Sequence, residues 1–196
     1  TGSNIVALGA NTLRGSSNNT GSDNVAVGTG AMRNSTTGSE NVAVGKDSLY
    51  ENTTGGNNTA VGRLSLDANT TGNDNVAIGN VALTNATTAS NNTAVGSRCL
   101  LTNTTGTSNT GVGHDCLESS TTSDNNTAMG FEAMKSNTTG TRNTAIGSLA
   151  LDSNIGGSDN TALGYASLQA NTSGTQNTAI GQKALENNST ALLKAP

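Results

Sequence analysis

The pentapeptide Asn58-Thr59-Ala60-Val61-Gly62 decides the fold, because the chain repeats it with small changes along most of its length. It returns unchanged at residues 92–96, and the variants NVAVG, NVAIG and NTAIG fill most other units. From Gly28 to Gly181 the closing glycine recurs with a seventeen-residue period and without a slip. A fixed short period is the signature of a solenoid, in which each repeat forms one coil stacked on its neighbours. We therefore interpret the chain as one repeat array.

The array spans residues 1–196 as a single unit with two irregular places. The first repeat carries a two-residue insertion near 14–20, since the interval from Gly9 to Gly28 is two residues longer than the intervals that follow. The last repeat loses the pattern from about residue 188. The chain also starts inside a repeat-like segment, TGSNIVALG, so we expect a processed product or a fragment of a longer protein.

Composition excludes several classes of protein. Leu, Ile, Val and Phe make up only 32 of 196 residues, which is low for a globular domain, but the net charge of -4 is small and the apolar residues keep fixed columns. Disordered sequence has no reason to keep such columns. A membrane-spanning segment needs an apolar run of about 18 residues or more, and the chain contains none, so we expect no membrane insertion. It also has no basic stripe, so we expect no nucleic-acid partner.

We number the repeat from its Asn, so that N-T-A-V-G occupies positions 1 to 5. Position 2 is Val or Thr, position 4 is Val, Ile, Leu or Met, and position 9 is Leu or Met in every unit. The alternation predicts a short strand at positions 2 to 4, ended by the position-5 Gly. A second short strand is expected around position 9, followed by an NTTG turn in which the position-15 Gly supplies a positive φ. The predicted fold is all-β, a parallel β-solenoid of eleven coils of about 17 residues, roughly 50 Å long.

The strand pattern also predicts which side chains face inward. Positions 4 and 9 are the expected coil core, comprising Val27, Val44, Val61, Ile78, Val95, Ile146, Leu49, Leu66, Leu83, Leu100, Leu151 and Leu168. Position 3 would then face outward, and it is always Ala or Gly. A restriction to small residues suggests close approach by another copy of the chain, with Ala26, Ala43, Ala60, Ala77, Ala94, Ala128, Ala145, Ala162 and Ala179 as trimer-facing candidates. The alternative is that Ala fits a tight bend.

The array offers little that resembles an enzyme site, which needs several unlike residues converging. His114 is the single histidine and is interpreted as a solvated turn residue. Cys99 and Cys116 share position 8 on adjacent coils, and both buried thiols and a disulfide are open interpretations. Acidic residues before the Asn column, such as Asp23 and Asp74, lack the calcium β-roll pattern. We expect no catalysis, no cofactor and no metal, and we interpret the Asn column as a ladder of hydrogen-bonded amides.

The strands NTAIG and NVAVG resemble the S-V-A-I-G strand in the head repeats of YadA-type trimeric autotransporter adhesins, which form a left-handed parallel β-roll. The longer units NTAIGSLALDSN and NTTGTRNTAIG are similar to the Asn-Thr-Thr-Gly arrays of phage tail-fibre-like and bacterial surface proteins. This resemblance implies a homotrimeric, extracellular rod on a cell surface or virion that attaches to a host-cell receptor or glycan. The repeat here is longer than that of the adhesin heads, and the chain shows no heptads, neck or membrane anchor.

Three functional hypotheses follow. The first is a non-enzymatic shaft or head of an attachment fibre. The second is an ice-binding solenoid that uses two ranks of threonine: one rank is Thr53, Thr70, Thr87, Thr104 and Thr121, and the other is Thr54, Thr71, Thr88, Thr105 and Thr122. The third is the protomer of an extracellular filament. Neighbouring residues in a strand face opposite ways, which argues against one flat face built from both ranks.

Overall fold

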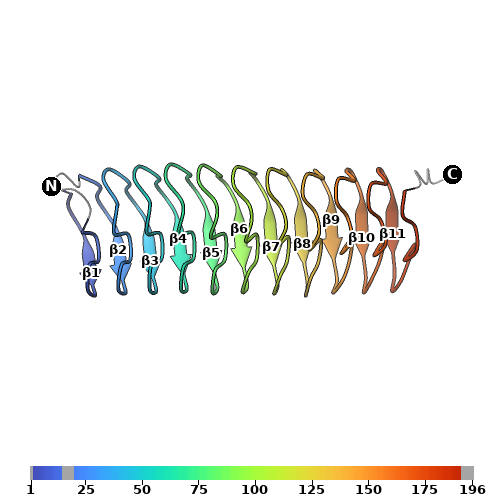
Figure 1. Cartoon of the computed structure of the whole chain (residues 1–196), viewed down its shortest axis with the longest axis horizontal. Coiled ribbons are helices and arrows are strands. Elements are labelled where there is room, and N and C mark those ends of the chain that lie inside the picture. Colours follow the sequence, from blue (N-terminus) through green and yellow to red (C-terminus); the bar gives the residue numbers. More distant parts are fainter. Residues whose placement is uncertain (1, 15–19, 191–196) are drawn as a thin grey trace.

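The chain forms a straight stack of coils, seen side-on in the computed structural model (Figure 1), which describes residues 2–14 and 20–190. Within those residues each coil contributes one three-residue strand, and all the strands lie parallel in one sheet in chain order. The strands are β1 (Val6–Leu8), β2 (Val25–Val27), β3 (Val42–Val44), β4 (Thr59–Val61), β5 (Val76–Ile78), β6 (Thr93–Val95), β7 (Thr110–Val112), β8 (Thr127–Met129), β9 (Thr144–Ile146), β10 (Thr161–Leu163) and β11 (Thr178–Ile180).

The predicted parallel β-solenoid is therefore confirmed, and the described residues contain no helix. Most of the insertion near 14–20 falls on residues 15–19, and the irregular end from about 188 falls mostly on 191–196. Both stretches lie outside the described residues.

Equivalent residues pair with one another from coil to coil. In β3 and β4, for example, Val42 lies opposite Thr59 and Val44 opposite Val61. Hydrogen bonds between coils fix this register, since the N–H of Val42 donates to the carbonyl of Asn58 at 2.8 Å. Each position of the repeat consequently forms a straight column along the rod.

The strand turns its position-3 side chain into the coil and its position-4 side chain outward, which is the reverse of the sequence expectation. The alanines at position 3 (Ala26, Ala43, Ala60, Ala77, Ala94, Ala128, Ala145, Ala162 and Ala179) are buried inside the coil of a single chain. The position-4 residues expected in the core are on the outer side, half-buried at Val27, Val44, Val61 and Val95 and exposed at Ile78 and Ile146. The six core leucines, Leu49, Leu66, Leu83, Leu100, Leu151 and Leu168, are fully buried.

The narrow interior explains this reversal. Opposite Cys99 even an alanine does not fit, because a Cβ on Gly111 would lie 2.5 Å from the Cys99 sulfur. Small residues at position 3 therefore reflect the width of the coil, and the interpretation that they face another chain is wrong. The branched side chains of positions 2 and 4 take the outer face because the interior cannot hold them.

The leucine column at position 9 lies in a turn. The expectation of a second short strand around this position is therefore wrong. Leu49 has a φ of 51°, in the left-handed region, as do Asp47 at 53° and Asn57 at 57°. These three places, positions 7, 9 and 17, are where each coil bends. A left-handed leucine costs about 1 to 2 kcal/mol, and burial of its side chain returns a similar amount.

The two glycine columns have different causes. Gly45 at position 5 has a φ of 139°, which favours glycine, and a Cβ there would also overlap the carbonyl of Gly62. Gly55 at position 15 has no positive φ of this kind, contrary to expectation. A Cβ on Gly55 would instead overlap the carbonyl oxygen of Gly72 and lie 2.5 Å from Asn52 Oδ1. Position 15 is therefore glycine because neighbouring atoms leave no space.

Candidate functional site

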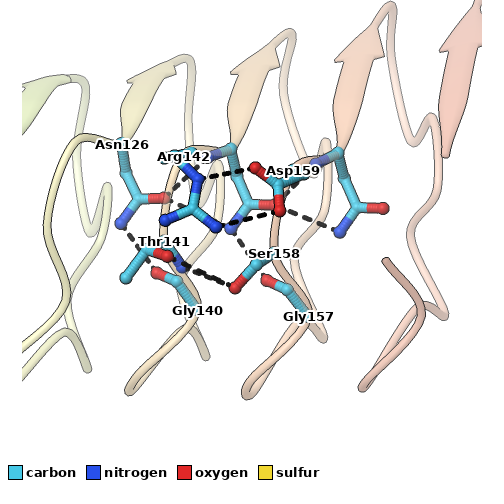
Figure 2. Close-up of polar contacts among 9 residues, drawn as sticks. Asn126, Gly140, Thr141, Arg142, Gly157, Ser158 and Asp159 are labelled. Atoms are coloured by element: carbon cyan, nitrogen blue, oxygen red, sulfur yellow. Dashed lines mark hydrogen bonds and ion pairs between the residues drawn. The ribbon is translucent and has the colours of Figure 1, made fainter. Parts of the chain in front are cut away.

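The coil interior contains a continuous column of asparagines at position 1, which we call the strand-side asparagine file. Its members are Asn24, Asn41, Asn58, Asn75, Asn92, Asn109, Asn126, Asn143, Asn160 and Asn177. Asn92 Oδ1 accepts hydrogen bonds from the backbone N–H of Asn109 at 2.9 Å and from its Nδ2 at 3.2 Å. Asn92 Nδ2 donates to the carbonyl of Gly106 at 2.9 Å. The predicted amide ladder is confirmed, and Figure 2 shows the equivalent bond from Asn126 to Gly140.

A second column at position 12, the turn-side asparagine file, runs parallel to the first inside the coil. It contains Asn52, Asn69, Asn103, Asn137, Asn154 and Asn171, all fully buried. Asn154 Nδ2 donates to Asn137 Oδ1 at 2.8 Å and to the carbonyl of Gly157 at 3.0 Å. Ala86 and Ser120 interrupt the file, and the Oδ1 atoms of Asn69 and Asn103, next to these breaks, have no hydrogen-bond partner.

Because these columns fill the interior, only side chains at outward-facing positions can contact other molecules. The strand face, formed by positions 2 and 4, carries an uninterrupted aliphatic column at position 4: Leu8, Val27, Val44, Val61, Ile78, Val95, Val112, Met129, Ile146, Leu163 and Ile180. Every one of these side chains is half-buried or exposed in the single chain. A long exposed apolar stripe on a regular surface marks an interaction site.

The turn edge, formed by positions 6, 7 and 10, carries the main group of charges. Asp115 is buried, and its carboxylate lies 3.4 Å from Arg98 Nε and 3.5 Å from Lys135 Nζ. Arg98 also bonds Glu118, and this bond is the main cause that raises the pKa of Arg98. Because Arg98, Asp115 and Lys135 come from three successive coils, the group ties those coils together.

His114 lies beside this group at the surface. Its Nδ1 is 3.2 Å from Asp115 Oδ1, and its ring stacks on Phe131 with centroids 5.8 Å apart and planes 17° apart. The histidine thus contacts a carboxylate and an aromatic ring. This contact set fits a structural role on the turn edge, in line with the interpretation as a turn residue.

Two further carboxylates, those of Asp67 and Asp159, have pKa values shifted in opposite directions by their surroundings. Partial burial, followed by the negative charges of Asp47 and Glu51, raises the pKa of Asp67 to about 6. Arg142 on one coil bonds Asp159 on the next at 2.6 and 3.0 Å, as Figure 2 shows. These bonds lower the pKa of Asp159. Asp159 and the other acidic residues of position 17, Asp23, Glu40 and Asp74, are exposed.

Cys99 and Cys116 are free thiols buried in the coil. A hydrogen bond with Cys116, followed by burial, raises the pKa of Cys99, so its thiol stays protonated at neutral pH. Cys116 Sγ lies 3.2 Å from the carbonyl of Ala128. Both sulfurs thus serve as small core atoms.

The two threonine ranks lie on different surfaces. Thr53, at position 13, is half-buried and its hydroxyl donates to the carbonyl of Thr70 at 2.8 Å, a bond repeated up the rank. Thr54, at position 14, is exposed. The first rank is therefore part of the hydrogen-bond ladder between coils, and the two ranks do not form one face.

No known protein family, curated protein or solved structure matches this chain. Across residues 2–14 and 20–190, no three or more His, Cys, Asp or Glu side chains are grouped so that they could hold a metal ion. The same residues contain no helix that is long and apolar enough to cross a membrane.

Proposed function

We propose that the chain is a non-enzymatic, rigid segment of an extracellular attachment fibre, the shaft or head of a cell-surface adhesin or phage tail fibre. In this proposal three copies lie side by side and the assembled rod contacts a host-cell receptor or glycan. The resemblance of NTAIG and NVAVG to adhesin head repeats supports this assignment.

The position-4 column of the strand face is the observation that carries the proposal. It stays apolar in every unit although its side chains are half-buried or exposed, while exposed position 17 varies among Asp, Asn, Ser, Arg, Glu and Gln. A free surface would not need to stay apolar for the length of the rod. Packing of strand faces from several copies would bury this column and would supply stability that the small coil interior lacks.

Solution mass of the whole chain tests the assembly. Light scattering is expected to give three times the 19.4 kDa of one chain. The variant Ile78→Lys/Ile146→Lys places two charges on the strand face and is expected to give a mass of one chain, because a lysine cannot be buried there without a partner. A matched control, Thr71→Lys/Thr139→Lys, places the same charges at exposed position 14 and should leave the mass unchanged.

A wild-type mass equal to that of a single chain, measured at tens of micromolar, would contradict the assembly. Equal masses for the strand-face variant and its control would contradict the assignment of the interface. Electron microscopy of the same samples distinguishes discrete rods from the end-to-end filaments of the third hypothesis.

Ice binding is the second candidate, and the strand face favours it more than the turn ranks do. Threonine fills position 2 in six consecutive coils: Thr93, Thr110, Thr127, Thr144, Thr161 and Thr178. Each lies two residues from the aliphatic column, on the same outward side of the sheet. A regular array of hydroxyl and methyl groups about 4.8 Å apart could order surface water.

A thermal-hysteresis measurement separates the two candidates. The fibre proposal predicts no hysteresis at any concentration, because association covers the strand face. Hysteresis that is lost in Thr127→Lys/Thr144→Lys would favour ice binding and contradict the proposed assembly.

A further inference from the structure

Sequons for N-linked glycosylation, Asn-x-Ser or Asn-x-Thr, recur along the chain because of its repeat. Attachment of a sugar to the folded chain requires an accessible Asn amide, and the transferring enzyme must also reach the hydroxyl two residues later. The contacts of these two groups therefore decide which sequons are open. Between residues 20 and 180 the sequon asparagines are Asn34 and Asn85 at position 11, Asn52, Asn69, Asn103, Asn137 and Asn171 at position 12, and Asn57, Asn91 and Asn125 at position 17.

The position-12 sequons are closed, because their asparagines belong to the turn-side file and are fully buried. Asn137 Nδ2, for example, donates to the carbonyl of Gly140 at 3.0 Å. A sugar on this nitrogen would have to lie in the filled interior of the coil. Glycosylation of the folded chain at position 12 is therefore excluded.

The position-11 sequons have a hydroxyl that is already bonded. The hydroxyls of Thr36 and Thr87, two residues after Asn34 and Asn85, donate to carbonyls of the next coil at 2.8 and 3.3 Å. Asn34 Nδ2 also donates to Glu51 Oε2 at 2.9 Å. Recognition of these sequons by an enzyme would break bonds that join neighbouring coils.

The position-17 sequons are open at both groups. Their asparagines are exposed and lie at a bend of the coil, with φ values of 57°, 60° and 59° at Asn57, Asn91 and Asn125. In the part of the chain that the structure describes, these side-chain amides form no hydrogen bond. The same holds for the hydroxyls two residues later, which belong to the half-buried Thr59, Thr93 and Thr127. Both groups are thus available to an enzyme.

The sequence couples the two groups of this sequon. Position 2 is Val in β2, β3 and β5, and an acidic residue precedes each of these strands at position 17, whereas β4 begins with Thr59 and follows Asn57. Val42 and Val76 lie on either side of Thr59 in the sheet, so the strand itself does not require Thr there. From residue 20 onward, every Asn at position 17 is followed by Thr at position 2.

The spacing of the three asparagines leaves room for attached sugars. They lie just before β4, β6 and β8, which are alternate strands of the sheet (Figure 1). Two coil steps separate neighbouring asparagines, a distance of about 9.6 Å. The intervening position-17 residues, Asp74 and Ser108, have short side chains. A row of sugars can therefore occupy this edge without crowding.

We propose that Asn57, Asn91 and Asn125 are acceptor sites for N-linked glycosylation of the folded chain by an enzyme that uses a nucleotide-activated sugar. In this reaction a bond forms between Asn Nδ2 and C1 of the sugar, and Nδ2 loses one proton. The bond between C1 and the diphosphate oxygen breaks, so that the nucleoside diphosphate leaves. The inference goes beyond the attachment function and does not depend on it.

Enzymatic transfer to the purified, unmodified full chain tests the sites. The probe is a soluble asparagine glycosyltransferase with a UDP-hexose, chosen because it modifies short peptides that span Asn57 and Asn137 at similar rates. Peptide mapping by mass spectrometry is expected to find hexose on the folded chain at Asn57, Asn91 and Asn125 and none at Asn137. The peptides show that any difference comes from the fold.

Two acceptors are compared, because copies of the chain packed on the strand face would cover the Thr59 hydroxyl. These are the wild type and the single-chain variant Ile78→Lys/Ile146→Lys. Transfer to both, or to the variant alone, supports the sites. Their test does not depend on the mass measurement, so the sites can fail while the fibre proposal stands.

Thr59→Val separates the sequon from the exposed amide. It reproduces the Val of the neighbouring strands, and it should abolish transfer to Asn57 while the other two sites keep their hexose. Thr110→Val is the matched control, since Ser108 occupies position 17 of that coil and all three sites should stay active. Circular dichroism of each variant checks that the coils remain folded.

Three results would overturn the proposal. The first is no transfer to any of the three sites in the folded Ile78→Lys/Ile146→Lys acceptor. The second is transfer to Asn137 in the folded chain that equals transfer to Asn57. The third is transfer to Asn57 that survives Thr59→Val unchanged.

Discussion

The two asparagine files run side by side through the same coils, yet only one of them is continuous. The strand-side position is Asn in every coil from Asn24 to Asn177, whereas the turn-side position of the same coils is Ser35, Ala86 or Ser120 in three of them. Both files donate to the same acceptor, since the carbonyl of Gly55 receives Asn41 Nδ2 and Asn52 Nδ2, each at 2.9 Å. The amide donor alone therefore does not explain why one file is constant.

The backbone explains the difference. Each strand-side Oδ1 accepts the main-chain N–H of the next asparagine, as Asn92 does for Asn109. The backbone N–H of a turn-side residue does not depend on a side-chain acceptor. That of Asn103, for example, donates to the carbonyl of Leu100 in its own coil at 3.2 Å. A buried N–H without an acceptor costs free energy, whereas a lost side-chain pair costs less. A column is therefore constant where its side chain satisfies a buried backbone group.

The largest expected effect is the difference between one deletion in each file. Asn92→Ala leaves the buried Asn109 N–H without an acceptor and opens a cavity, so we expect it to lower the free energy of unfolding by about 3 kcal/mol. Asn154→Ala removes three side-chain bonds but orphans no backbone N–H, so about 1 kcal/mol is expected. Urea unfolding of both variants measures the difference. Equal losses would break the distinction between the files.

The next effect concerns the glycine column beside the turn-side file. Gly55→Ala brings a Cβ to 2.5 Å from Asn52 Oδ1 and should destabilise the fold by about 2 kcal/mol. The chain itself pairs Ala86 with Ala89, so Asn52→Ala/Gly55→Ala should lose less than the sum of its single changes, with a coupling of about 1 kcal/mol. A double-mutant cycle by urea unfolding gives the coupling. Strict additivity would show that the two columns are independent.

A smaller effect extends the comparison to the cysteine column. Gly111→Ala should cost about 1 to 2 kcal/mol because its Cβ meets Cys99 Sγ at 2.5 Å. Cys99→Ala/Gly111→Ala reproduces the Ala82 and Ala94 pair of the preceding coils, so it should be at least as stable as Cys99→Ala alone. Thermal unfolding of the three variants under reducing conditions provides the check. A double variant that is less stable than Cys99→Ala would contradict this account of Gly111.

The smallest expected effect is on the pH dependence of stability and comes from the Asp67 carboxyl, which lies outside both asparagine files. The pKa of Asp67 rises from 3.8 to about 6 on folding, so its contribution to stability is present below pH 3.8 and is lost as pH rises through 6. Asp67→Asn should therefore raise stability at pH 7 by up to about 1 kcal/mol, a value reduced for its partial exposure, and flatten the pH profile between pH 4 and 6.

Asp159→Asn is the control for Asp67, because Arg142 lowers the pKa of Asp159 below 3.8 and its titration falls outside that window. Urea unfolding across this pH range measures both variants. An unchanged slope in Asp67→Asn would contradict the assignment.

Much of the fold could be predicted from the repeat alone. The seventeen-residue spacing predicted one coil per unit, and the Val-Ala-Val alternation placed the strand correctly at positions 2 to 4. Alternation states which residues share a side but does not state which side is inside. Hydrophobicity alone put Val44 in the core, whereas the width of the coil decides in favour of Ala43.

The remaining errors have similar causes. A left-handed leucine such as Leu49 has no local sequence signal, because tertiary burial holds it in that conformation. A signal was available for the packing of the columns, since Ala86 changes together with Ala89, Ser120 with Ser123, and Gly111 follows Cys99. Departures from the repeat that coincide in two columns therefore indicate contact between those columns. The sequence alone could not identify the strand face as a candidate interface, because it did not show that the position-4 side chains point outward.

Native-state hydrogen exchange of the Asn109 backbone amide reports whether the strand-side asparagines hold neighbouring coils together. We expect strong protection of this amide in the wild-type chain, loss of its protection in Asn92→Ala, and retention in Asn154→Ala. Rapid exchange in the wild type, or protection that survives Asn92→Ala unchanged, would contradict the claim that the strand-side asparagines hold each coil to the next.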